Sequence, residues 1–150
     1  MIEKITFKYP DGPRDAEALL LDPATKSLYI ISKEFGSTGL YKLAYPQSTT
    51  STTTAEKVGL IPNLLLVTAG DISSAGDEIL IRTYVNVNHW QIKVGTGLEE
   101  TLLNATPKKY LIPAEPQGEA IAFDRNASGY FTLSEIGNAS SVNLNYYKRK

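Results

Sequence analysis

The feature that most constrains the fold is one pattern that recurs three times at a fixed spacing. Glu17-Ala18, Thr68-Ala69 and Glu119-Ala120 lie 51 residues apart, twice over. Counting on in the same register reaches two further matched sets: Asp22, Ser73 and Asp124, then Ser32, Thr83 and Ser134. A period of this length indicates repeated units that stack side by side, because one unit alone cannot bury its apolar face. We therefore expect three copies of one unit in this chain of 150 residues.

Each unit is predicted to consist of short β-strands. The second apolar window of each unit is rich in Ile, Leu, Tyr, Phe and Thr, which fit a pleated, packed surface. Leu28-Tyr29-Ile30-Ile31 and Ile79-Leu80-Ile81 are apolar on both faces, which indicates sheets that are covered on both faces. Helical character is confined to residues 98–103, where we expect one turn at most. The predicted strands are 16–22, 27–34, 39–45 and 55–61, then 65–73, 78–85, 88–94 and 108–112, then 118–124, 129–136 and 141–148.

The third unit lacks a fourth strand, and the N-terminus offers one at residues 2–9. This segment ends in Tyr9-Pro10, as the other fourth strands end in Ile61-Pro62 and Ile112-Pro113. Proline suits a strand exit because it cannot donate to a ladder. Four strands per unit and a period of about 40–50 residues are what β-propeller blades require. The prediction is an all-β fold with blades of four antiparallel strands, a β-sandwich being the alternative. One domain over 1–150 then holds repeats at approximately 16–61, 65–112 and 118–148.

Three blades imply a partner. Propellers close with about 4–8 blades, and an arc of three leaves two large apolar faces exposed, which monomers rarely tolerate. Such an arc also separates strand 2–9 from strand 141–148, so strand 2–9 is expected to complete the last blade of a second copy. We predict a two-fold homodimer that forms one six-bladed ring. The alternative is that the chain is a fragment of a longer six-bladed protein.

Composition narrows the classes of function. The chain is 42% hydrophobic with a net charge of −1, so it is globular and has no electrostatic footprint for nucleic acid. It has no apolar run near the ~18 residues needed to cross a membrane, and no visible secretory signal. We therefore expect a cytoplasmic location and neither a membrane nor a nucleic-acid partner. The lack of cysteine excludes thiolate chemistry, and a single histidine, His89, cannot build a multi-histidine metal site.

The candidate site centres on the first strand of each unit. Glu17, Thr68 and Glu119 begin these strands, so they are expected to face the axial channel near one mouth. In the dimer this gives a ring of four Glu and two Thr, and clustered carboxylates repel unless they bind a cation, protonate or find donors. Oxygen ligands would suit calcium or magnesium on the axis, held by Glu17 and Glu119. The other interpretation is that these carboxylates bond backbone amides or face channel water.

Three further residues are candidates near the same mouth. Arg82 interrupts an apolar strand where the other units have Ile31 and Leu133. A buried arginine must pair, so Arg82 is expected to contact Glu17 or Glu119 of a neighbouring blade, or an anionic ligand. Arg14 and Asp15 lie in the loop before the first unit. The matched Asp22, Ser73 and Asp124 are expected to cap turns, and the matched Ser32, Thr83 and Ser134 to bond neighbouring backbone.

Two phrases carry a resemblance to known proteins. Residues 15–23 (DAEALLLDP) and 117–124 (QGEAIAFD) resemble the inner strands of a broad group of six-bladed propellers. This group includes SMP-30/gluconolactonase-like, NHL-like and phytase-like esterase propellers. The resemblance implies a six-bladed architecture with these strands innermost. The chain differs from the catalytic members in being about half their length and in having Thr68 where the other units have glutamate.

Three functions are consistent with this sequence. The first is a non-catalytic propeller that binds a small molecule or a protein, favoured because no nucleophile–base pair, phosphate loop or dinucleotide motif is present. The alternative is a metal-dependent hydrolase of the lactonase or phosphoesterase kind, in which axial carboxylates hold the ion that activates water. A two-fold symmetric site is a handicap for the alternative, because it cannot easily separate the roles of acid and base. A third possibility is a structural role of the dimer itself.

Overall fold

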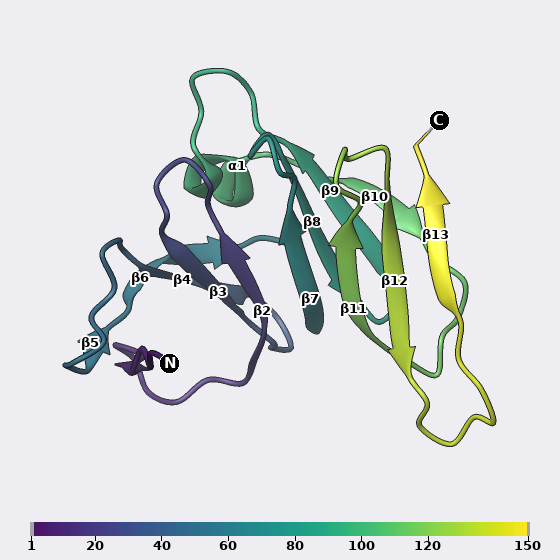
Figure 1. The fold of residues 1–150 in the computed structure, drawn as a ribbon, viewed down its shortest axis with the longest axis horizontal. Helices are drawn as coiled ribbons and strands as arrows, with labels where there is room; N and C mark the ends of the chain where they lie inside the picture. Colours follow the sequence, from purple (N-terminus) through teal and green to yellow (C-terminus); the bar gives the residue numbers. More distant parts are fainter. Residues whose placement is uncertain (1, 150) are drawn as a thin grey trace.

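Three antiparallel sheets lie side by side in chain order (Figure 1). The structure is a computed structural model that describes residues 2–149. In each sheet, neighbouring strands are also consecutive along the chain, apart from the short β5. The first sheet contains β2 (Ala16–Leu21), β3 (Leu28–Ser32), β4 (Thr38–Leu43) and β6 (Glu56–Ile61). The second contains β7 (Val67–Ile72), β8 (Glu78–Thr83), β9 (Asn86–Gln91) and β10 (Lys108–Leu111). The third contains β11 (Gln117–Phe123), β12 (Gly129–Glu135) and β13 (Leu144–Lys148). The predicted all-β class is confirmed.

The first two strands of every sheet pair in the same register. Ala16 lies opposite Ser32, Val67 opposite Thr83, and Gly118 opposite Ser134. In each case the register then shifts within the next two residues, which is the mark of a β-bulge. The bulged residues are Glu17, Thr68 and Glu119. A bulge redirects the side chain it carries, so these three residues occupy equivalent places in their sheets.

The first strands of the three sheets are neighbours in space. β2 lies against β7, and β7 lies against β11 (Figure 1). The largest core cluster joins the first sheet to the second, where Leu20, Ile31, Ile81 and Trp90 are each at most 2% exposed. A smaller cluster around Leu80 and Ile121 joins the second sheet to the third. The sheets are therefore held together face to face through apolar contacts, the main source of stability in such a fold.

The helical segment is longer than the single turn expected. Helix α1 (Leu98–Asn104) follows β9 and packs against β6 and β9. Leu98 and Leu102, one turn apart, are buried on this surface. Packing of an apolar face stabilises a short helix more than its own propensity does, so a weak sequence signal was sufficient here.

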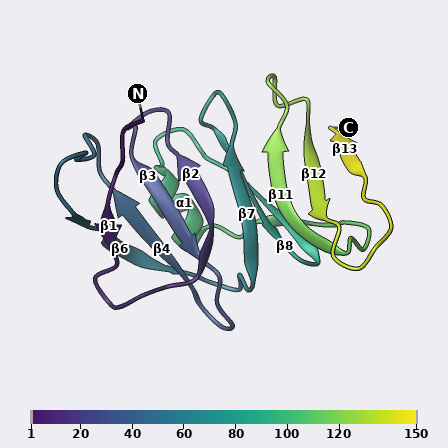
Figure 2. The same cartoon turned by 60° about the horizontal axis from the view of Figure 1, so that its bottom comes forward.

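The N-terminal strand differs from its prediction. Instead of a strand over 2–9, the structure has β1 (Phe7–Lys8), which pairs in parallel with β5 (Thr53–Thr54) of the β4–β6 connection. Phe7 and Tyr9 pack against the first sheet, whereas residues 2–6 are exposed and have no comparable apolar contact. The two chain ends lie at opposite ends of the row (Figures 1 and 2). β1 therefore does not complete the third sheet of its own chain, and pairing with a second copy stays a prediction.

The outer face of the third sheet is apolar and uncovered. Leu133 and Leu144 lie opposite each other and are 43% and 66% exposed, and Tyr146 beside them is 45% exposed. The cross-strand register places on this one face Ala120, Ala122, Phe131, Leu133, Leu144 and Tyr146. A contiguous apolar face of this kind on a folded protein marks an interaction site.

The outer face of the first sheet, at the other end of the row, is only partly covered. Phe7 and Tyr9 lie over its outer strands, around Ile30 and Tyr41. Its inner part is open, with Leu19 60% and Leu21 56% exposed. The row of sheets thus ends in two apolar faces.

Candidate functional site

A polar network joins Glu17 and Glu119, on first strands, through two residues that directly follow second strands. The Lys33 ammonium lies 2.8 Å from Glu17 Oε1 and 2.7 Å from the Tyr84 hydroxyl. The Tyr84 hydroxyl donates to Glu119 Oε1 at 3.2 Å, and the Gln117 amide donates to the same oxygen at 2.9 Å. We call these five residues the mouth network. Lys33 and Tyr84 are themselves 51 residues apart, so the structure brings Glu17 and Glu119 together through matched positions.

The mouth network holds two carboxylates and one ammonium. Burial lowers the pKa of Lys33, but the hydrogen bonds to Glu17 and Tyr84 outweigh it and leave this pKa above its usual value. The hydrogen bonds from Gln117 and then Tyr84 lower the pKa of Glu119. One ammonium thus stands between two carboxylates at neutral pH.

The mouth network does not resemble a metal centre in the isolated chain. Glu17 is already paired with an ammonium, and within residues 2–149 no three His, Cys, Asp or Glu side chains gather closely enough to hold a metal ion. Thr68 was expected to line the channel, but it is buried, with 1% exposure. Its hydroxyl has no hydrogen-bond partner in the described part of the chain. Calcium or magnesium on the axis of the closed ring stays a prediction.

The expected partner of Arg82 was wrong. Arg82 is completely buried, and its Nη2 lies 2.6 Å from Oε2 of Glu115 in the β10–β11 loop, not beside Glu17 or Glu119. Its Nη1 donates to the carbonyl of Ala120 at 3.0 Å. The guanidinium occupies the space above Gly118, where an added Cβ would fall 1.6 Å from Nη2. Arg82 therefore ties the second sheet to the third, and it is not placed to contact a ligand.

Glu115 was missed because it lies outside the repeated motif. Burial raises its pKa, but hydrogen bonds from Arg82 and Thr132, with a smaller one from Asn145, outweigh it and leave the pKa below its usual value. The available sequence signal was Gly118, which replaces Ala16 and Val67 of the other units. Because glycine has no side chain, Gly118 leaves room for the guanidinium of the inward-pointing Arg82.

Arg14 and Asp15 lie beside the mouth network without joining it. Arg14 pairs with Asp11 at 3.0 Å and with Glu34 at 3.5 Å. Asp15 is exposed, and its backbone carbonyl accepts from the Lys33 amide at 2.8 Å. Asp15 positions Lys33 through the backbone, and a place for both residues at the mouth of a channel stays a prediction.

The matched turn and strand-end residues act as predicted. Asp124 Oδ1 accepts from the amides of Asn126 and Ser128, and Asp22 Oδ1 accepts from the Ala24 amide. The hydroxyls at the strand ends accept from backbone amides: Gly39 to Ser32, Asn86 to Thr83 and Gln117 to Ser134. These residues stabilise turns and strand ends.

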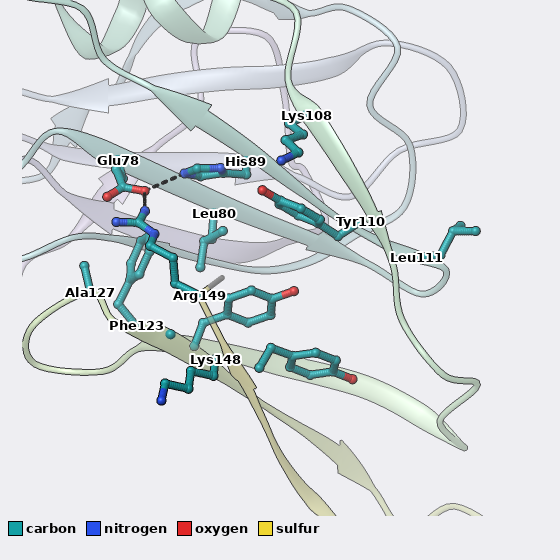
Figure 3. Close-up of a pocket in the computed structure, with 13 residues that line it drawn as sticks. Glu78, Leu80, His89, Lys108, Tyr110, Leu111, Phe123, Ala127, Lys148 and Arg149 are labelled. Atoms are coloured by element: carbon teal, nitrogen blue, oxygen red, sulfur yellow. Dashed lines mark hydrogen bonds and ion pairs between the residues drawn. The ribbon is translucent and has the colours of Figure 1, made fainter.

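A cleft between the second and third sheets was not predicted from the sequence (Figure 3). Its volume is about 510 Å³, and its walls come from β8, β9 and β10 on one side and β11, β12 and β13 on the other. We call it the tyrosine cleft. Its aromatic lining is His89, Tyr110, Phe123, Tyr130 and Tyr147. Its charged lining is Glu78, Lys108, Lys148 and Arg149.

The single acid of the tyrosine cleft is neutralised within it. Glu78 is 4% exposed, and its Oε2 lies 2.7 Å from Nε2 of His89 and in contact with the Arg149 guanidinium (Figure 3). The ring of His89 also stacks on Tyr110, with centroids 6.0 Å apart. Burial, together with the neighbouring Tyr147 and Tyr110 hydroxyls, raises the pKa of Tyr130 to about 12. The Tyr130 phenol is therefore a neutral hydrogen-bond donor at physiological pH.

The fold and these sites define an all-β chain of side-by-side antiparallel sheets whose first strands carry the matched polar residues. No protein-family model matches the sequence, and the search of curated proteins found no match. Among solved structures, a chain of Kuenenia stuttgartiensis hydrazine synthase is similar over 89% of this chain and 34% of its own length. The TM-score is 0.58 at 9% identity. At this identity the likeness concerns the fold alone, and this chain spans about a third of that one. Within residues 2–149 no helix is long and apolar enough to cross a membrane.

Proposed function

We propose that this protein is a non-catalytic binding module in which each sheet is a propeller blade and two copies close one six-bladed ring. In this arrangement the outer face of the third blade packs on the outer face of the partner's first blade, and the two-fold axis generates this junction twice. The observation that carries the proposal is that these two apolar faces match in the positions and sizes of their side chains.

Burial at equivalent positions supports this junction. Leu20, Ile31 and Leu40 of the first blade are at most 1% exposed where the second blade covers them. The third blade has Ala122, Leu133 and Leu144 at the equivalent positions, and they are exposed. The third blade thus presents the face that the first blade buries.

Side-chain size is also complementary across the proposed junction. Between the first and second blades, the large Leu20 packs over Gly70, whose added Cβ would lie 2.9 Å from Leu20 Cδ2. At the proposed junction the small Ala122 takes the place of Leu20, and Leu19 takes the place of Gly70. In the first pair a leucine packs over a glycine, and in the second an alanine packs under a leucine. The combined side-chain volume is preserved, as close packing requires.

The position of β1 fits the same arrangement. Tyr110 of the outer strand β10 packs against the same apolar cluster as Tyr130 of the following blade. β1 packs Phe7 and Tyr9 against the first blade in a similar manner, as an outer strand of a preceding blade would. Within residues 2–149, β1 pairs only with β5 and β13 only with β12. Each has a free edge, so β1 of one copy is suited to complete the third blade of the other.

The polar groups favour binding over hydrolysis. The mouth network holds its carboxylates in an ion pair with Lys33 and in hydrogen bonds with Tyr84 and Gln117. Such satisfied groups are poor ligands for an ion that must activate water. No observation favours the alternative of a metal-dependent hydrolase, although an ion on the axis of the closed ring would revive it.

Sedimentation equilibrium tests the proposal. The expected mass is twice the 16.4 kDa of one chain. Leu144→Glu places a charge on the outer face of the third blade, where the side chain is 66% exposed in one chain, so it should give a folded monomer. Val94→Glu is the control and should remain dimeric, because the Val94 side chain in the β9–α1 loop is fully exposed. A monomeric wild type, or an open filament, would contradict the proposal.

A further inference from the structure

The tyrosine cleft occupies a wedge that is filled elsewhere in the molecule. Between the first and second sheets, α1 packs on β6 and β9 and closes the periphery (Figure 1). The equivalent strands at the next junction are β10 and β13, and the cleft opens between them. In the part of the chain that is described, no element covers this wedge. The cleft therefore lies where α1 lies at the first junction, and no segment of residues 2–149 fills it.

The walls of the tyrosine cleft suit a flat ring. Tyr130 and Tyr147 are stacked with centroids 4.9 Å apart and an interplanar angle of 14°. Tyr110 and His89 form a second stacked pair from the other sheet. Aromatic side chains from both sheets therefore line the same space, and planar groups gain most from such surfaces.

The charge of the tyrosine cleft suits an anion. Glu78 is matched by His89 and Arg149, whereas neither Lys108 nor Lys148 has a carboxylate within ion-pair distance among residues 2–149. The Lys108 ammonium lies 5.0 Å from the centroid of Tyr110, so cation and ring lie side by side. A ligand with a negative group next to an aromatic body would meet both.

A buried hydroxyl strengthens this assignment. Tyr147 lines the cleft, and its hydroxyl is shielded from solvent without a hydrogen-bond partner in the described structure. A buried polar group without a partner is costly and calls for an explanation, such as a bound water or ligand. The raised pKa of Tyr130 adds a second neutral donor nearby.

We propose that the tyrosine cleft binds a small planar aromatic anion, with the ring between the tyrosines of the two sheets and the negative group at Lys108 and Lys148. The proposal deepens the proposed binding function by naming the class of ligand. The cleft lies within one chain, so ligand binding can be tested whether or not two chains form the six-bladed propeller. The anionic group is a carboxylate or a phosphate, as in an aromatic acid or a nucleotide.

The test is a titration of the ¹⁵N-labelled full chain, followed through the amide signals of β10 and β13. Indole-3-acetate and adenosine monophosphate are the two probes, one for each anionic group. Tryptamine, adenosine and inorganic phosphate are the controls, because each lacks either the negative charge or the ring. Saturable shifts at the cleft are expected for at least one probe, and at least tenfold weaker binding for all three controls.

Charge reversal on β10 supplies matched variants. Lys108 lines the cleft, and its neighbour Lys109 does not. Lys108→Glu and Lys109→Glu change the net charge equally, yet only the first should weaken binding, by about tenfold or more. Tyr147→Phe keeps the ring and should weaken binding less. No saturable shift with either probe would overturn the proposal. So would equal binding of phosphate, or equal loss in both lysine variants.

Discussion

The guanidinium of Arg82 and the carboxylate of Glu115 form a buried ion pair, 2.6 Å apart, between the second and third sheets. Their side chains are 0% and 7% exposed. Thr132 and Asn145 also donate to this carboxylate, so its oxygens are well satisfied. This pair is a structural link and not a ligand site.

Removal of one partner should be costly. Glu115→Ala leaves the Arg82 charge buried and unpaired, which destabilises a protein by about 3–5 kcal/mol. Urea unfolding would measure the loss. Replacing both residues with leucine should be much less harmful than Glu115→Ala alone, because no unpaired charge remains. Equal stability of wild type and Glu115→Ala would contradict the assigned role.

Gly118 should be coupled to Arg82. Gly118→Ala adds a Cβ where the guanidinium lies, and overpacking of this kind costs about 1–3 kcal/mol. In an Arg82→Ala background the same change should cost little, because the space is then free. A double-mutant cycle measures the interaction. Additive effects would show that the two residues do not share this space.

Asp124 should contribute to stability against acid. Its hydrogen bonds from Ser128, and then from Tyr146, lower its pKa to about 2. The folded pKa lies below the unfolded value, so this stabilisation is present above about pH 4 and is lost as the pH falls toward 2. Asp124→Asn should flatten the dependence of the urea midpoint on pH between 5 and 2. An unchanged slope in this variant would be evidence against the contribution.

Calcium should not stabilise the protein. Glu17 is already paired with Lys33, and Glu119 is held by Tyr84 and Gln117. A cation that binds only the folded state raises the melting temperature, and we expect no rise at millimolar calcium. The melt should be run on the proposed dimer, in which the carboxylates of two copies would face one axis. A clear rise would restore the axial cation and the hydrolase alternative.

The sequence predicted those features that depend on local pattern. Alternation and matched turn residues located nearly all the strands, because a strand's faces and its turn caps are set within a few residues. Asp22 and Asp124 cap turns as expected for this reason. Glu17, Thr68 and Glu119, which the spacing aligned, each lie at a bulge between the first two strands of a sheet.

Features that join distant segments were not predictable in the same way. Arg82 and Glu115 are 33 residues apart, and nothing local selects Glu115 over other acids. The tyrosine cleft brings together residues from 78 to 149, and its existence depends on an unfilled wedge between two sheets. β1 is short because only Phe7 and Tyr9 find apolar surface, which depends on the first sheet's packing.

The most direct test of ring closure is to mix two variants, each damaged on a different face. Leu19→Glu places a charge on the outer face of the first sheet, and Leu144→Glu places one on the outer face of the third. Both leucine side chains are more than half exposed in one chain. Each variant alone has no intact junction and should be monomeric, with the circular dichroism of the wild type. A one-to-one mixture restores one intact junction, so sedimentation should detect a heterodimer. If the mixture stays monomeric while the wild type is a dimer, the dimer uses other surfaces and the ring is wrong.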